Sequence, residues 1–197
     1  MNGVYRRLKI AKQAEQIRKE PPPLPGNGPY RVIVIDPPWP YEKRDEDPSH
    51  EGVRPYHSMS VEEICAVKVA SIAHEDCILW MWVTNHHMRE ALELLDAWGF
   101  EYKTNVVWVK DKFGLGSFIR GQHEHLLIAI KGDIPCPLPE NRPPSVITAR
   151  RREHSRKPDE AYEIIERMYP TLPKIELFAR QTRPGWAAWG NQVGTAA

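Results

Sequence analysis

The stretch RVIVIDPPW, residues 31–39, joins a short apolar run to a stiff turn. A β-branched run bounded by breakers is typical of a buried strand in a parallel sheet. In open sheets of this kind, ligands bind at the carboxyl ends of the strands, which is where Asp36 stands. Two prolines then restrict the backbone, so Asp36 and Trp39 are expected to keep fixed relative positions. The stretch predicts an α/β fold with a functional turn; the alternative is a strand-ending turn with a structural tryptophan.

Strands and helices alternate along the rest of the chain. Apolar runs predict further strands at 76–83, 105–110, 123–132, the start of 145–157, 174–180 and 185–192. Helical patterns cover 60–73, 86–100 and 158–170, and Ser60 with Glu63 forms a capping box that marks the first of these. This alternation predicts one layered α/β domain with a mainly parallel sheet.

Composition excludes several classes of protein. With 41% hydrophobic residues among 197, the chain can bury a core, and its net charge of +1 excludes a uniformly basic nucleic-acid binder. It has no apolar run of the length that crosses a membrane and no apolar signal core. Its three cysteines form no CxxC pair and are expected to be reduced thiols, so a cytoplasmic location is expected.

The N-terminal region differs in composition from the rest. Residues 4–20 have a helical composition rich in basic side chains, and the proline-rich segment 21–29 cannot continue a helix. We therefore expect an N-terminal helix and linker at 1–29 and a single domain at 30–197. A basic helix of this kind is either a solvated surface helix or a nucleic-acid contact.

Several motifs in order along the chain resemble one known family. DPPW (36–39) is similar to the catalytic motif of the MT-A70-like adenine-N6 methyltransferases. That family includes bacterial and phage DNA methyltransferases and the catalytic subunit of the eukaryotic messenger-RNA methyltransferase. The resemblance continues through PYHSMS (55–60), LWMWVTN (79–85), WGF (98–100), VVWVK (106–110), GQHEHLLIAIKG (121–132), HSRKPDE (154–160), KIELFAR (174–180) and WGNQ (189–192). It covers roughly residues 31–193 and is nearer the prokaryotic and phage branch.

The resemblance implies a fold, a cofactor and a set of cofactor residues. The fold is a three-layer Rossmann-like methyltransferase domain that binds S-adenosylmethionine (SAM), with circularly permuted motifs, so that DPPW precedes the cofactor strand KIELFAR. The implied cofactor residues are Asp36, Lys157, Phe178, Arg180, Asn191 and Gln192. Two departures stand out. Ala179 replaces a frequent glycine, and Gln181 and Thr182 stand where the eukaryotic relative has a His-Asn pair that contacts the ribose.

The same resemblance makes Asp36, Pro37, Pro38 and Trp39 the catalytic residues. Adenine N6 is a poor nucleophile because its lone pair is delocalised into the ring. Acceptors aimed at its N–H groups, the Asp36 carboxylate and the Pro37 carbonyl, would favour the reactive form. Trp39 offers a face on which the base can stack. No histidine or cysteine spacing matches a metal site, so none is expected; Glu124 and His125 are expected to be structural or loop-orienting.

Basic and aromatic residues flank the expected mouth of the site, which suits phosphate contact and base stacking. The candidates are Tyr41, Lys43, Arg44, Arg54, Tyr56, Lys112, Phe113, Arg120, Arg150, Arg151, Arg152 and Arg156. The expected function is N6-adenine methylation of DNA in a prokaryotic or phage-infected cell, with a homodimer as the expected assembly. The alternatives are an RNA methyltransferase and a non-catalytic member of the family that binds nucleic acid and supports an active partner.

Overall fold

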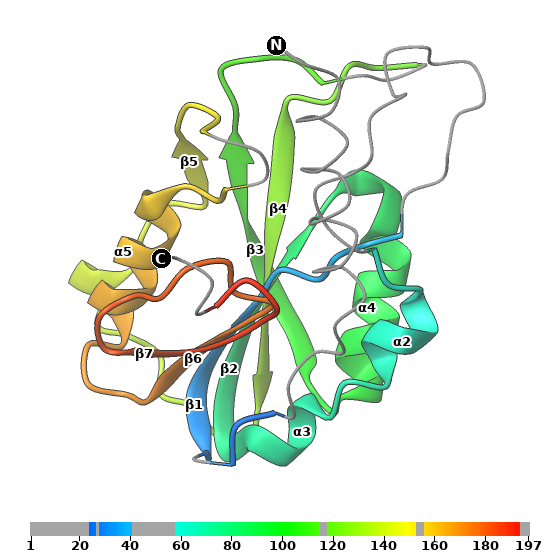
Figure 1. Cartoon of the computed structure of the whole chain (residues 1–197). Coiled ribbons are helices and arrows are strands. Elements are labelled where there is room, and N and C mark those ends of the chain that lie inside the picture. Colours follow the sequence, from blue (N-terminus) through cyan, green and yellow to red (C-terminus); the bar gives the residue numbers. More distant parts are fainter. Residues whose placement is uncertain (1–23, 27, 41–57, 115–117, 153–155, 194–197) are drawn as a thin grey trace, which may run out of the picture.

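The computed structural model describes residues 24–26, 28–40, 58–114, 118–152 and 156–193. These residues form one seven-stranded sheet with the spatial order β5-β3-β4-β2-β1-β6-β7 (Figure 1). The strands are β1 (Tyr30–Ile35), β2 (Ala73–Val83), β3 (Glu101–Val109), β4 (His123–Lys131), β5 (Val146–Thr148), β6 (Lys174–Leu177) and β7 (Trp186–Trp189). The expected helix and linker at 1–29 lie almost wholly outside the described residues.

The sheet is mainly parallel, as predicted, with one reversed strand. β1 pairs in parallel with β2 and β6, β6 with β7, and β3 with β5. β4 is antiparallel to both β2 and β3, because it follows β3 in a hairpin. The carboxyl ends of the other six strands therefore meet at one edge of the sheet. This edge carries Asp36, Arg150 and Phe178, which we predicted to be functional. It also carries Lys110, which lies two residues before the predicted residue Lys112.

Helices cover both faces of the sheet, which confirms the three-layer α/β fold. Two cores lie on opposite faces (Figure 1). One packs under α2 (Val61–Cys65), α3 (Val69–Ile72) and α4 (Met88–Ala97), and the other packs under α5 (Asp159–Met168). Two short 3₁₀ turns, η2 (Asn85–His87) and η3 (Pro139–Asn141), complete the described elements. The permuted order of the motifs stays a prediction.

The helix predicted over 60–73 is wrong in one respect, because it is two helices. The capping box of Ser60 and Glu63 does start α2, but that helix stops after Cys65. On a continuous helix Val69 would point about 140° away from Ile64. The break between α2 and α3 lets both side chains reach the same core, where each is fully buried. Burial of Val69 therefore decides where the helix breaks.

The strand predicted at 105–110 begins earlier than expected. β3 starts at Glu101, and its first four side chains are exposed. β5 pairs only with the last three residues of β3, so the first part of that strand lies at the edge of the sheet. A polar edge segment lacks the apolar pattern that identifies a buried strand.

In the described part of the chain, no helix combines the length and apolar character needed to cross a bilayer.

Candidate active site

The DPPW turn, residues 36–39, leaves β1 beside the end of β6. The Asp36 amide donates to the Leu177 carbonyl at 3.4 Å. Within the turn, the Trp39 amide donates to the Pro37 carbonyl at 2.8 Å, and the Met59 amide donates to the Pro38 carbonyl at 2.9 Å. The Pro37 carbonyl therefore already accepts one hydrogen bond. A carbonyl oxygen has two lone pairs, so it retains the capacity for one more.

The side chain of Trp39 is held from two sides. Its indole N–H donates to the Trp82 carbonyl at 3.0 Å. Its ring stacks on the imidazole of His87, with centroids 5.1 Å apart and planes 7° apart. His87 lies in η2, directly after β2, and sequence reasoning assigned it no role because a histidine at a helix start has no distinctive pattern. One face of the predicted stacking residue is thus already covered by a neighbouring ring.

Asp36 and Lys157 form the centre of a chain of alternating charges. The Lys157 ammonium lies 2.9 Å from Asp36 Oδ1 and 3.1 Å from Glu124 Oε2, and Glu124 Oε1 lies 2.5 Å from Lys110 Nζ. The Lys157 side chain is only 10% exposed and also sits 5.4 Å from the centre of the Trp82 ring. Glu124 lies in β4, and the other three residues lie on the segments that follow β1, β3 and β5. Residues far apart in the sequence therefore meet at one edge of the sheet.

This chain of charges shifts the pKa of each group inside it. Burial raises the pKa of Asp36 above its usual range, although Lys157 and Arg180 act in the opposite direction. Burial alone would lower the pKa of Lys157, but Asp36 and Glu124 outweigh it and raise that pKa. For Glu124, the ammonium groups of Lys157 and Lys110 outweigh burial and lower the pKa. The raised pKa of Lys157 keeps its ammonium charged between Asp36 and Glu124.

The predicted cofactor residues other than Asp36 and Lys157 follow β6 and β7, which are neighbours in the sheet. Phe178 adopts a positive φ of 59°, and its ring meets the edge of Trp189 at 5.2 Å. The Ala179 amide donates to the Trp189 carbonyl at 2.9 Å. A Cβ on Gly190 would lie 2.4 Å from the Ala179 carbonyl oxygen, so only glycine permits this approach. The two strand ends form one joined backbone corner.

Asp36, Lys157, Phe178 and Arg180 are thus gathered at one edge of the sheet. Arg180 lies close enough to Asp36 to lower the pKa of that carboxyl. Asn191 and Gln192 follow Gly190 and are exposed at the same end of β7. The edge therefore combines a buried acid, a buried ammonium and a tight glycine corner.

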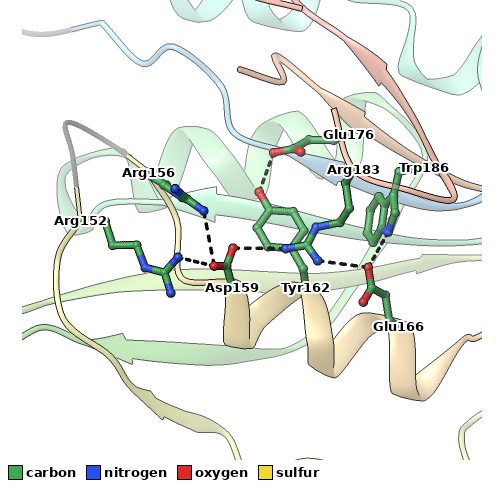
Figure 2. Close-up of polar contacts among 8 residues, drawn as sticks. All are labelled: Arg152, Arg156, Asp159, Tyr162, Glu166, Glu176, Arg183 and Trp186. Carbon is green, nitrogen blue, oxygen red and sulfur yellow. Dashed lines mark hydrogen bonds and ion pairs between the residues drawn. The ribbon is translucent and has the colours of Figure 1, made fainter. Parts of the chain in front are cut away.

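A second polar cluster joins α5 to the segments around β6 and β7 (Figure 2). The Tyr162 hydroxyl donates to Glu176 Oε1 at 2.6 Å, and burial, which outweighs that bond, raises the pKa of Glu176 to about 7. Arg183 reaches Asp159 and Glu166, each at 3.3 Å. A surface pocket of about 370 Å³ opens here, lined by Arg156, Asp159, Glu163, Gln181, Thr182, Arg183 and Pro184. The available signal for Glu176 was a carboxylate between the apolar residues Ile175 and Leu177 of a buried strand, and sequence reasoning missed it.

The predicted nucleic-acid residues divide into four groups. Tyr41, Lys43, Arg44, Arg54 and Tyr56 lie outside the described residues. Lys112, Phe113 and Arg120 are exposed on the β3–β4 connection, where the Arg120 guanidinium lies 5.3 Å from the centre of the Phe113 ring. Arg150 and Arg151 are exposed after β5, and the Arg151 amide donates to Asp111 at 2.8 Å, which joins this segment to that connection.

Arg152 and Arg156, in contrast, are both paired with Asp159 (Figure 2). Their charge is therefore partly neutralised before any ligand arrives.

Glu124 and His125 both make side-chain contacts in the structure. Asn105 donates to His125 Nδ1 at 2.9 Å, and His125 Nε2 donates to Asn85 at 3.0 Å, so this imidazole connects β3 to η2.

Known proteins match most of this chain. The MT-A70 family model matches residues 30–192. The type II methyltransferase M.MunI of Mycoplasma sp. is 35% identical over 181 residues, which cover 83% of this chain and 78% of that protein. Two eukaryotic proteins match over 84% of this chain. They are an N(6)-adenosine-methyltransferase MT-A70-like protein of Arabidopsis thaliana, 34% identical, and the human N(6)-adenosine-methyltransferase catalytic subunit METTL3, 32% identical.

The extent of the match differs between these relatives. The chain spans about a quarter of the two eukaryotic proteins, at 24% and 28% of their lengths, but most of M.MunI. Methyltransferases of this kind in general take their methyl group from SAM. The family match over the whole sheet, together with the DPPW turn beside the β6–β7 corner, confirms the resemblance seen in the sequence. The chain belongs to the MT-A70 family of N6-adenine methyltransferases.

Proposed function

We propose that this protein is a SAM-dependent methyltransferase that modifies adenine N6 in DNA. The observation that carries the proposal is the buried Asp36–Lys157 pair, at 2.9 Å, next to the corner formed by β6 and β7. Asp36 is an acceptor for the amine and Lys157 is a cation for the cofactor, and both lie at the same edge of the sheet. The likeness to M.MunI over 78% of that protein's length favours DNA as the substrate.

The residues at the edge fit SAM as donors and acceptors. Lys157 has three N–H donors, of which Asp36 and Glu124 take two, and the third is left for the carboxylate of the cofactor. Phe178 and Arg180 would flank the adenosine, and Asn191 and Gln192 would bind the ribose hydroxyls. Gly190 keeps the backbone corner free of a side chain. When bound, SAM supplies the activated methyl group.

The protein's own groups would then orient and activate the amine. Asp36 and the free lone pair of the Pro37 carbonyl accept the two N–H groups of adenine N6, which localises the nitrogen lone pair. Pro37 and Pro38 keep these acceptors rigid, so most of the rate gain is positioning. The raised pKa of Asp36 makes its carboxylate a better acceptor of the N6 proton than an ordinary aspartate. In duplex DNA the base must first leave the stack.

Two other functions are compatible with parts of the site. Likeness to METTL3 favours RNA as an alternative substrate, although the chain covers only 28% of that protein. A non-catalytic member that supports an active partner is the other alternative, and the retention of both Asp36 and Trp39 argues against it.

We further propose action in the cytoplasm of a prokaryotic or phage-infected cell. A homodimer is proposed too, because one small domain offers little area for reading DNA.

Transfer of tritiated methyl groups from SAM to matched DNA and RNA pools tests the proposal. We expect label on DNA at adenine N6, mapped by nucleoside analysis, and far less on RNA. Asp36→Ala should abolish transfer and leave SAM binding by calorimetry largely intact. The control is Asp96→Ala, an exposed aspartate on α4. Preferential labelling of RNA would contradict DNA as the substrate. Full transfer by Asp36→Ala would contradict the role proposed for Asp36.

A further inference from the structure

The contact between His87 and Trp39 joins two separate segments of the chain. His87 comes from η2, after β2, and Trp39 comes from the turn after β1. Besides the ring stack, the His87 Nε2–H donates to the Pro40 carbonyl at 2.9 Å. The imidazole therefore binds both the ring of Trp39 and the backbone that directly follows it. Such a double contact fixes the position of the indole relative to Asp36.

These contacts restrict where a planar ligand can stack on Trp39. The indole N–H is satisfied by Trp82, and the imidazole covers one face of the ring. Within the described ranges, no second ring stacks on Trp39. A planar ligand that stacks on this tryptophan therefore has to use the face opposite His87.

The imidazole is more polar than simple packing requires. Since Nε2 carries the proton that Pro40 accepts, Nδ1 is an acceptor. Nδ1 is buried and has no hydrogen-bond partner among the described residues. An apolar ring would cover Trp39 without burying an unpaired polar atom, which costs free energy. The ring stack on Trp39 and the hydrogen bond to Pro40 offset this cost.

We propose that His87 is a positioning residue that clamps Trp39 so that a single indole face receives the target adenine. The proposal rests on the function proposed above and adds a residue outside the DPPW turn to it. A stack between two rings contributes modestly, so loss of the imidazole corresponds to about a two- to tenfold loss of rate. The effect falls on kcat because the stacked base is held in the plane that Asp36 and Pro37 require.

Three variants separate the ring from its hydrogen bond. His87→Ala removes both, His87→Phe keeps the ring, and His87→Gln keeps a donor for Pro40 but has no ring. We expect Ala and Gln to lower kcat about two- to tenfold with an unchanged Kd for SAM, and Phe to retain most of the rate. His86→Ala, an exposed neighbour, is the control and should behave as wild type. Rescue by Gln but not by Phe, or wild-type kcat in His87→Ala, overturns the proposal.

A second measurement does not depend on activity. The difference in acrylamide quenching between the wild type and Trp39→Phe isolates Trp39 among the seven tryptophans. His87→Ala, compared with its own Trp39→Phe double variant, should make Trp39 more accessible to acrylamide. Unchanged accessibility would overturn the clamp even if kcat falls. If the wild type transfers no methyl group to any adenine, the proposed function fails, and the assignment of His87 to base positioning fails with it.

Discussion

Lys157 has the most constrained environment of the residues in the site. Two carboxylates and an indole face surround its ammonium group, and water reaches only 10% of the side chain. Removing a partner from a buried ion pair is costly because the remaining charge has lost both solvent and counterion. Here two like charges, Asp36 and Glu124, would be left facing the same space. Lys157 therefore stabilises the fold as well as the site.

Lys157→Ala should lower the free energy of unfolding by about 3 kcal/mol, because it leaves two buried carboxylates without their shared cation. Urea denaturation followed by circular dichroism measures this. The matched control is Lys103→Ala, whose pair with Glu101 is exposed and is expected to contribute less than about 1 kcal/mol. Equal losses in the two variants would contradict the account of Lys157.

The buried carboxyl of Glu176 should make the stability of the protein depend on pH. Its pKa rises from 4.5 to about 7 on folding, so between these values the unfolded chain has already lost a proton that the native state still holds. The free energy of unfolding of the wild type should therefore fall with pH in this window, by on the order of 2–3 kcal/mol. Glu176→Gln can keep the bond from Tyr162 and should lack this fall.

Urea denaturation at pH 5 and pH 8 tests this difference. The advantage of Glu176→Gln over the wild type should grow from the lower to the higher pH. Glu163→Gln, an exposed glutamate on the same α5, serves as the control. A gap between Glu176→Gln and the wild type that is constant with pH would show that Glu176 does not titrate as the burial of its carboxyl implies.

At the scale of elements, the corner between β6 and β7 determines the shape of the cofactor edge. The positive φ of Phe178 ends β6, and the close approach of Gly190 to Ala179 brings the end of β7 against it. Both features are local, but each depends on the other strand for its position. The two strand ends are packed together, so a change at Gly190 is expected to shift the backbone at Phe178.

Gly190→Ala should therefore damage both stability and cofactor binding. Its Cβ would meet backbone atoms at 2.4 and 2.8 Å, and backbone cannot rotate away as a side chain can. We expect a loss of about 1–3 kcal/mol in the free energy of unfolding and a weaker calorimetric affinity for SAM. Gly26→Ala is the control, because a Cβ there meets nothing within 4 Å. Unchanged SAM affinity in Gly190→Ala would separate the corner from the cofactor site.

At the scale of the whole molecule, the distribution of charge matters more than its sum. The net charge is only +1, yet exposed basic side chains on the β3–β4 connection and after β5 lie at the same edge as the DPPW turn. Arg152 and Arg156 are partly neutralised by Asp159. A ligand of high negative charge would therefore meet Lys112, Arg120, Arg150 and Arg151 first.

The double variant Arg150→Ala/Arg151→Ala should bind duplex DNA more weakly and with a shallower dependence on salt. Each phosphate contact contributes about 0.9 to the slope of log K against log salt, so the slope should fall by about 2. Fluorescence anisotropy between about 50 and 200 mM salt measures it. Arg167→Ala, at the far end of α5, should leave the slope unchanged. An unaltered slope in the double variant would exclude these arginines from the interface.

Local patterns were enough for most of the fold. Strand positions, the capping box at Ser60 and the placement of Asp36 at a strand end all follow from residue order, because burial and turn chemistry act over a few neighbours. The break between α2 and α3 and the early start of β3 did not follow. The first depends on which core Val69 reaches, and the second on an edge position in the sheet.

The contacts that define the site depend on distant segments. Lys157 with Asp36 and Glu124, and His87 with Trp39, join residues that no local pattern relates. They meet because β1 and β2 are parallel neighbours that end at the same edge, and because β4, which runs opposite to β2 and β3, begins at that edge. Residue order thus decided which chemical groups end each strand. Only the lateral order and direction of the strands decided which of those groups touch, since that order is fixed by packing across the whole sheet.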